Sequence, residues 1–273
     1  MRFRFLLCLV LIIAFLCGSS SRGDGPPRIV GHRGLMRHAP ENTLTGFAAC
    51  IELRLGFELD IRRSKDGMLV IMHDDDLRRT TGVKGKIGDF TLAELRKLDV
   101  GRWFDTAFKG ERVPTLEEVF KLMKERGHAE TLIALDIKVE DETLAGEVVA
   151  LAKKHGVLNQ VMCIGLAIEG PQLRAKLRAA DAKTPVAVLA SQRDDLPKAL
   201  AQKNADWAYV RFIPTADEVK QIHGLGKRVF LVGKLVAGNE PENWRRAAEV
   251  GVDALLTDFP LECQQAFRGV QTK

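Results

Sequence analysis

Strand-like and helix-like segments alternate along most of this chain, and this alternation limits the fold more than any other feature. Short apolar runs typical of buried strands occur at 28–32, 56–61, 131–138, 160–166, 185–189, 207–212, 228–232 and 252–257. Apolar residues at helical spacing occur between the later runs, at 143–155, 170–180, 194–203, 216–223 and 240–250. Eight strands, each followed by helix within about 245 residues, predict a single-domain (β/α)8 TIM barrel.

A doubly wound open sheet is the alternative α/β fold. No GxGxxG sequence follows the first strand at 28–32, so the sequence does not support a dinucleotide-binding fold of that kind. In a (β/α)8 barrel, functional side chains gather at the carboxyl ends of the strands. The residues at those ends are therefore the candidates for a functional site.

Capping residues and glycines mark further helix boundaries. Thr91 with Glu94, and Thr115 with Glu118, have the spacing of capping boxes and predict two helices between the second and third barrel strands. Asn42 or Thr43 is the expected N-cap of the first helix. Glycines just after predicted helices are expected to be left-handed: Gly127, Gly156, Gly224 and Gly251.

The first 21 residues have the layout of a secretory signal peptide. Arg2 and Arg4 precede an apolar run at 5–17, and small residues follow at 18–21. The apolar run is shorter than the ~20 residues that span a bilayer, so we expect export and no stable membrane span in the mature chain. An uncleaved anchor or lipid attachment at Cys17 is the alternative. Residues 22–27 then form a linker, and 28–273 form the barrel domain.

Charge and cysteine content exclude some classes of protein. The formal net charge is +5, and removing Arg2 and Arg4 with the leader lowers it by two, which does not favour nucleic-acid binding. Cys50, Cys163 and Cys263 would remain. Three scattered cysteines form neither a disulfide framework nor a CxxC metal site, so stability must come from a core.

The second strand carries the first candidate site. Glu58 and Asp60 lie two residues apart, so they project from one face of a strand, with apolar side chains on the other face. A turn at 65–67 returns the chain through apolar 68–72 to His73 and Asp74. Two carboxylates beside a histidine suit metal-assisted hydrolysis, although surface pairing with Arg62, Arg63 or Lys65 would also explain the acids.

Other strand ends carry titratable residues as well. The first strand ends in His32 and Arg33, and the third places Asp136 and Lys138 two apart on one face. A barrel interior is otherwise packed with branched apolar residues, so these charges must be paired or bound to a ligand.

Several motifs, in order along the chain, resemble the glycerophosphodiester phosphodiesterase family. They are His32-Arg33-Gly34, Pro40-Glu41-Asn42-Thr43, Phe57-Glu58-Leu59-Asp60, Ser64-Lys65-Asp66-Gly67, His73-Asp74, Arg79-Thr80-Thr81-Gly82, Asp136-Ile137-Lys138 and Leu256-Thr257-Asp258-Phe259-Pro260. The resemblance covers nearly the whole chain after the leader and is densest through Arg79. This family folds as a (β/α)8 barrel, which agrees with the strand count.

The resemblance also implies a role for each site residue. Glu58, Asp60 and Asp136 would hold one divalent ion, Ca2+ or Mg2+, and His32 and His73 would be the acid/base pair. Arg33 and Lys138 would bind phosphate. The supporting residues would be Glu41, Asn42 and Asp74, with Asp74 positioning His73.

The chain departs from the family pattern at two positions. Asp136 stands where the family usually has glutamate, and 230–234 reads FLVGK where an aromatic WTVN-like run is usual. Arg211 and Lys234, after the sixth and seventh strands, are candidates for extra phosphate contacts or are surface bases.

The expected activity is metal-dependent hydrolysis of small-molecule glycerophosphodiesters to glycerol 3-phosphate and an alcohol. Two alternatives are cleavage of lysophospholipids and a catalytically weak phosphate- or sugar-binding barrel. Both histidines are present, which favours an enzyme because binding alone needs no acid/base pair.

Overall fold

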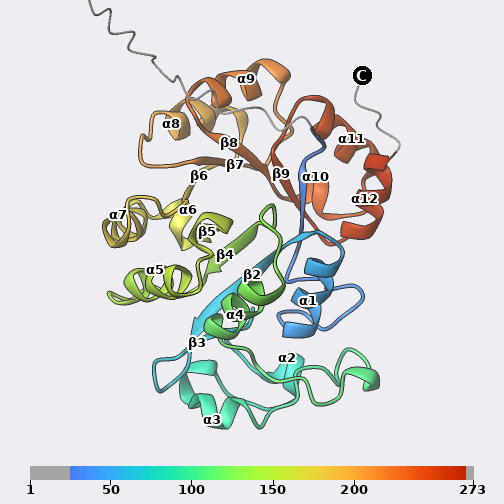
Figure 1. Cartoon of the computed structure of the whole chain (residues 1–273), viewed down its shortest axis with the longest axis vertical. Coiled ribbons are helices and arrows are strands. Elements are labelled where there is room, and N and C mark those ends of the chain that lie inside the picture. The colour runs from blue at the N-terminus through green and yellow to red at the C-terminus, as the bar shows by residue number, and fades with distance from the viewer. Residues whose placement is uncertain (1–24, 269–273) are drawn as a thin grey trace, which may run out of the picture.

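The computed structural model describes residues 25–268, and the predicted signal peptide lies outside them. Eight parallel strands form the centre of the molecule (Figure 1) in the order β5-β4-β2-β1-β9-β8-β7-β6. Between β5 and β6 the sheet is joined by an isolated bridge from Cys163 to Val186, so the barrel is nearly closed. The predicted (β/α)8 barrel is confirmed. Its strands are β1 (Arg28–Gly31), β2 (Gly56–Arg63), β4 (Ile133–Ile137), β5 (Val161–Gly165), β6 (Ala187–Ala190), β7 (Trp207–Val210), β8 (Arg228–Leu231) and β9 (Ala254–Thr257).

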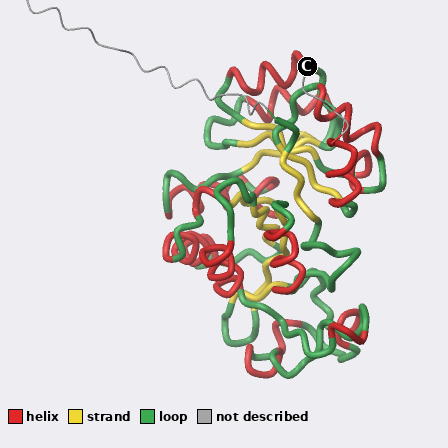
Figure 2. Tube along the Cα trace, turned by 45° about the vertical axis from the view of Figure 1, so that its right-hand side comes forward, coloured by secondary structure: helices red, strands yellow, loops and turns green. Residues whose placement is uncertain are grey.

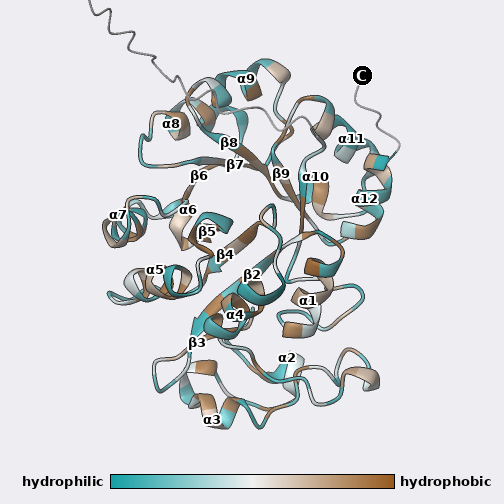
Figure 3. Cartoon of the chain, in the orientation of Figure 1, coloured by the Kyte–Doolittle hydropathy of each residue, from teal (hydrophilic) through white to brown (hydrophobic). Residues whose placement is uncertain are grey.

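Helices surround the strands, as the tube in Figure 2 shows. Their apolar faces pack against the outward side chains of the sheet, and polar residues cover the outside (Figure 3). No helix within residues 25–268 is long and apolar enough to cross a membrane. The helices around the barrel are α1 (Leu44–Glu52), α4 (Leu116–Arg126), α5 (Leu144–Lys154), α6 (Leu166–Glu169), α7 (Pro171–Ala180), α8 (Leu196–Leu200), α9 (Ala216–Gly224), α10 (Lys234–Ala237), α11 (Pro241–Glu249) and α12 (Pro260–Arg268), with 3-10 turns η3 (Leu158–Gln160) and η4 (Arg193–Asp195).

An insertion lies between β2 and β4, at the lower end of Figure 1. It begins with β3 (Leu69–Ile71), which pairs antiparallel with β2 as the predicted return strand. The insertion has a small apolar core of its own around Leu77, Leu95 and Val113. Both predicted capping boxes are present, but the first caps only a single turn. The other elements of the insertion are α2 (Arg78–Thr81), η1 (Ile87–Asp89), α3 (Leu92–Leu95) and η2 (Thr106–Phe108).

Two of the four helix-end glycines differ from the prediction. Gly156 and Gly251 are left-handed, with φ of 73° and 86°. Gly127 is extended instead, and glycine is needed there because a Cβ would lie 2.4 Å from the carbonyl oxygen of Met123. Gly224 ends α9 itself, and the left-handed position falls two residues later at Gly226, with φ of 71°.

The alternation of side chains along β2 places the site inside the barrel. Phe57, Leu59 and Ile61 face outward into the core beneath the helices, as predicted. Glu58 and Asp60 face inward and are almost completely buried, at 1% and 0% exposure. Most other interior side chains are apolar and include Val30, Ala134, Met162, Trp207, Phe230 and Ala254.

Candidate active site

Three carboxylates meet at the carboxyl end of the barrel. Glu58 and Asp60 come from β2, and Asp136 comes from β4, where it is in register with Asp60. One oxygen from each carboxylate lies within 4.8 Å of the others. The parallel ladder therefore brings together the acids that the sequence placed on separate strands.

The ionised forms of Glu58 and Asp136 are disfavoured by their surroundings. Burial raises the pKa of Glu58 well above its usual range, and the charges of Asp60 and Asp136 raise it further, although the backbone N–H of Arg33 donates to Glu58 Oε2 at 2.8 Å. Burial also raises the pKa of Asp136 despite its bond to Lys138. A cation placed among these oxygens would favour their ionised forms.

The donor set fits a hard divalent cation. The three groups supply carboxylate oxygens, which Ca2+ and Mg2+ prefer. Within residues 25–268, the buried oxygen Asp136 Oδ1 accepts no hydrogen bond and is thus available as a ligand. Gly165 at the end of β5 makes room for it, because a Cβ there would lie 2.0 Å from Asp136 Oδ1. The shorter aspartate side chain is thus accommodated at this position, and the cluster could hold a metal ion.

Two predicted phosphate-binding cations lie against the acids. Lys138 Nζ is 2.6 Å from Asp136 Oδ2 and 3.1 Å from Asp60 Oδ1. The two carboxylates raise the lysine pKa, outweighing the opposite effect of burial. Arg33, in the left-handed region with φ of 53°, directs its Nε to 3.7 Å from Asp60 Oδ2.

Asn42 and Thr43, the two predicted N-cap candidates, make different contacts: Thr43 caps α1, and Asn42 binds Asp60. Thr43 is the N-cap of α1 and accepts from the backbone N–H of Gly46 at 3.2 Å. Asn42 donates through Nδ2 to Asp60 Oδ2 at 2.8 Å and accepts the Asp60 backbone N–H at 3.2 Å. Asn42 thus fixes the orientation of Asp60.

Each candidate catalytic histidine is held by a carboxylate. His73 Nδ1 is 2.7 Å from Asp74 Oδ1, as predicted, and His32 Nδ1 is 2.7 Å from Asp258 Oδ1. Both rings are partly exposed, and in each the contact at Nδ1 leaves Nε2 as the nitrogen that could exchange a proton with a ligand. The role of Asp258 was not predicted, although its position directly after the last strand was the available signal.

Arg79 links the two halves of the site. It donates to both oxygens of Glu41, at 2.8 and 2.7 Å, and through Nε to Asp74 Oδ2 at 2.5 Å. Glu41 also accepts from Arg33 Nη1 at 3.0 Å, so an unbroken chain of ion pairs runs from Arg33 to His73. The hydrogen bond from Arg79 lowers the pKa of Asp74 to about 2 and keeps it ionised. Sequence reasoning missed this connection.

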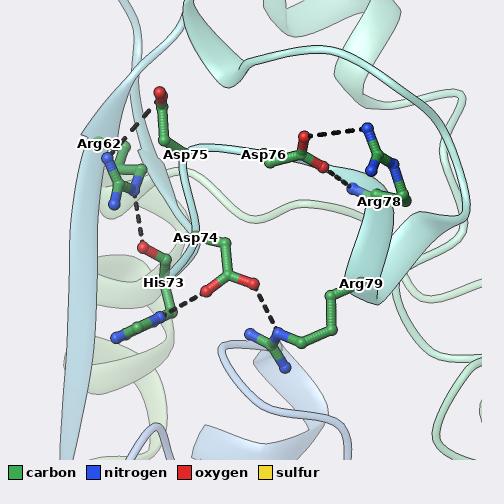
Figure 4. Close-up of a pocket in the computed structure, with 7 residues that line it drawn as sticks. All are labelled: Arg62, His73, Asp74, Asp75, Asp76, Arg78 and Arg79. Carbon is green, nitrogen blue, oxygen red and sulfur yellow. Dashed lines mark hydrogen bonds and ion pairs between the residues drawn. The ribbon is translucent and has the colours of Figure 1, made fainter.

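A cleft of about 560 Å³ opens beside His73 (Figure 4). The acids Asp75 and Asp76 in its wall pair with Arg62, Lys86 and Arg78 rather than forming a second metal cluster. Figure 4 shows His73, Asp74 and Arg79 in line at its lower edge. The cleft therefore gives solvent access to this side of the site.

Arg211 and Lys234 lie at the same end of the barrel but apart from the acids. Arg211 follows β7, and Lys234 is the first residue of α10 after β8. Both side chains are exposed. The structure thus places them at the mouth, without contact to the carboxylate cluster.

A parallel barrel whose strand ends gather buried carboxylates, two carboxylate-bound histidines and basic side chains is a hydrolase-type enzyme suited to anionic substrates. The model of the glycerophosphoryl diester phosphodiesterase family matches residues 32–262. The chain therefore belongs to this family.

Named relatives agree with this assignment. A glycerophosphodiester phosphodiesterase of Caldanaerobacter subterraneus subsp. tengcongensis is 45% identical over 111 residues, covering 40% of this chain and 44% of the relative. The chain thus matches less than half of that relative's length. The crystal structure of a glycerophosphodiester phosphodiesterase from Agrobacterium tumefaciens has a TM-score of 0.73 and 25% identity, covering 89% of this chain and all of that one. An Oleispira antarctica phosphodiesterase, solved with the product sn-glycerol-3-phosphate, shares the fold with a TM-score of 0.69 and 24% identity, covering 89% and 98% of the two chains.

Replacing Arg79 by alanine should reduce kcat about tenfold to a hundredfold, because Asp74 and Glu41 lose the cation between them. Losses of this size are typical when a residue that holds a site residue in place is removed. Arg78→Ala is the matched control, since among residues 25–268 the Arg78 side chain pairs only with the exposed Asp76. Because its pKa is lowered in the folded protein, ionised Asp74 contributes to the free energy of unfolding above about pH 4. This contribution is lost as the pH falls towards 2 and Asp74 becomes protonated. The Tm difference between wild type and Arg79→Ala should therefore shrink below about pH 4. A difference that stays constant with pH would contradict a stabilising interaction between Arg79 and ionised Asp74.

Proposed function

We propose that this protein hydrolyses glycerophosphodiesters to glycerol 3-phosphate and an alcohol. The observation that carries the proposal is the pair of carboxylate-bound histidines, His32 and His73, at the rim that holds Glu58, Asp60 and Asp136. Membership of the glycerophosphoryl diester phosphodiesterase family supports the substrate class. Export of the chain, with residues 1–21 removed, is part of the same proposal.

The charges of the site suit a phosphodiester. Glu58, Asp60 and Asp136 would hold one Ca2+ or Mg2+ ion, which when bound supplies Lewis-acid stabilisation of charge on phosphate oxygens. Three carboxylates with a divalent ion leave a charge of about −1, and the phosphodiester adds another. Arg33 and Lys138 bring the sum to about zero and orient the phosphate.

The histidines transfer the protons. One histidine accepts a proton from the nucleophile, the glycerol 2-hydroxyl, and the other donates a proton to the leaving alcohol through Nε2. Water then opens the resulting cyclic phosphate as the histidines exchange roles. Asp74 and Asp258 keep each ring in the required orientation through Nδ1.

Removal of divalent ions should reduce activity to background. The assay measures glycerol 3-phosphate released from glycerophosphoglycerol and glycerophosphocholine after EDTA treatment, and again after addition of Ca2+ or Mg2+. Metal addition should also raise Tm, because an ion that binds only the folded state stabilises it. The intact mass of the exported protein shows in the same preparation whether residues 1–21 are removed.

EDTA already saturated with Ca2+ is the control for chelator effects. Full activity in metal-free protein would contradict the metal dependence. Release of glycerol 3-phosphate from neither diester, with either ion, would overturn the proposed activity and leave lysophospholipids and simple phosphate binding as the alternatives to test.

A further inference from the structure

Three basic side chains at the barrel mouth have no acidic partner in the part of the chain that the structure describes. They are Arg211 after β7, Lys234 at the start of α10, and Arg37 in the loop after β1. All three are exposed, and across residues 25–268 no carboxylate oxygen lies within 4.0 Å of their side-chain nitrogens. In contrast, Arg33 and Arg79 on the other side of the mouth each form ion pairs with carboxylates.

Arg211 lies across the barrel from the carboxylate cluster. In the nearly closed strand order, four steps separate β7 from β2 in either direction, so the two strands are diametrically opposed. Tyr209 on β7 faces inward and packs edge-on against Phe230, with ring centroids 5.7 Å apart. Arg211 is two residues further on the same face, and its guanidinium carbon lies 5.9 Å from the Tyr209 ring centroid.

Tyr209 faces the barrel interior directly beneath Arg211. Burial raises the Tyr209 pKa to about 12, the charges of Asp136 and Glu58 raise it as well, and Arg211 opposes them. Tyr209 thus belongs to the same barrel interior as Glu58 and Asp136, with Arg211 beside it at the mouth. Because β7 lies opposite β2, a ligand that has its phosphate at Arg33 and Lys138 and extends across the mouth would point towards Arg211.

Arg37 and Lys234 continue the basic rim around the mouth. The guanidinium of Arg37 stacks 4.2 Å from the ring centroid of Phe259, next to the Asp258 that holds His32. Below these cations the ends of β8 and β9 carry apolar Val232 and Leu256, and the acid that follows β9, Asp258, is paired with His32. The side of the mouth formed by β7, β8 and β9 thus has a positive rim above an apolar floor.

We propose that this basic rim binds a second phosphate carried by the alcohol part of the substrate. The inference rests on the proposed function and narrows its substrate class to glycerophosphodiesters with an anionic alcohol. Glycerol is neutral, so electrostatics orients the charged end of such a substrate towards Arg37, Arg211 and Lys234. A cationic alcohol such as choline would be repelled from the same position.

The test compares kcat/KM, at low ionic strength, for three diesters that release the same glycerol 3-phosphate. Bis(glycerophospho)glycerol has an anionic alcohol, glycerophosphoglycerol a neutral one, and glycerophosphocholine a cationic one. We expect the anionic substrate to be preferred over the cationic one by at least about tenfold, and the preference to fall as salt screens the rim. Arg211→Gln should lower that ratio several-fold, and Lys220→Gln, on the outer helix α9, should not.

Equal kcat/KM values for the three diesters would overturn this inference alone, as would a preference that neither salt nor Arg211→Gln reduces. Absence of glycerol 3-phosphate from all three would overturn the proposed function and this inference together. The salt dependence of the substrate preference is measured on the wild-type protein, so this part of the test does not depend on the folding of any variant.

Discussion

Replacing either His32 or His73 by alanine is expected to reduce kcat by about 10²- to 10⁴-fold, the usual contribution of a positioned general acid or base. Affinity for glycerol 3-phosphate should change little, because Arg33 and Lys138 remain against the carboxylate cluster. Steady-state kinetics gives kcat, and calorimetric titration with glycerol 3-phosphate gives the affinity.

His223 offers a matched control for these variants. Its Nε2 lies 2.8 Å from Asp253 Oδ2, so it is also a carboxylate-bound histidine. Asp253 precedes β9, which places this pair at the opposite end of the barrel from the mouth. His223→Ala should therefore lower stability without a comparable loss of kcat.

The histidine prediction also separates an enzyme from a binding protein. If the His32→Ala and His73→Ala variants kept kcat within a few-fold of the wild type, the acid/base roles would be wrong. If both lost phosphate affinity as strongly as turnover, the rings would instead serve to bind the ligand, and simple binding would become the better description of the site.

The fold was predictable because it depends on local patterns that repeat. Apolar runs of strand length, separated by helical spacing, occur eight times, and a parallel barrel closes such a series. The insertion that begins with β3 and precedes α4 was harder to predict from the sequence, since its helices are single turns held by a small separate core. The conformation of Gly127 could not be predicted from the local pattern either, because contact with Met123, not a left-handed turn, requires glycine there.

The site was predictable where neighbours in sequence share a face. Glu58 with Asp60, Asp136 with Lys138, and His73 with Asp74 all follow from spacing of one or two residues. The partners that complete the site lie far apart in sequence: Arg79 reaches Glu41 across 38 positions, and Asp258 reaches His32 across 226. Only the closed barrel and the docked insertion bring these groups together.

Glu58→Gln should have opposite effects on stability and on activity. In the metal-free protein, burial and the charges of Asp60 and Asp136 disfavour the ionised form of Glu58, and neutral glutamine removes that cost while an oxygen can still accept the Arg33 backbone N–H. Removing about 1 kcal/mol of unfavourable electrostatic free energy from the folded state would raise Tm by ~2–4 °C in a domain of this size. Loss of a carboxylate ligand should lower metal-dependent kcat by at least about a hundredfold.

Calorimetry with EDTA and with added Ca2+ or Mg2+ distinguishes this account from a purely structural role. Wild-type Tm should rise on metal addition and that of Glu58→Gln should not, while Asp75→Asn, which changes an exposed carboxylate outside the cluster, should respond like the wild type. A Glu58→Gln protein that melted lower than wild type in EDTA would mean that the three acids are already balanced by Arg33 and Lys138. The cluster would then be a self-contained ion-pair network, and the reason for placing a metal among its oxygens would disappear.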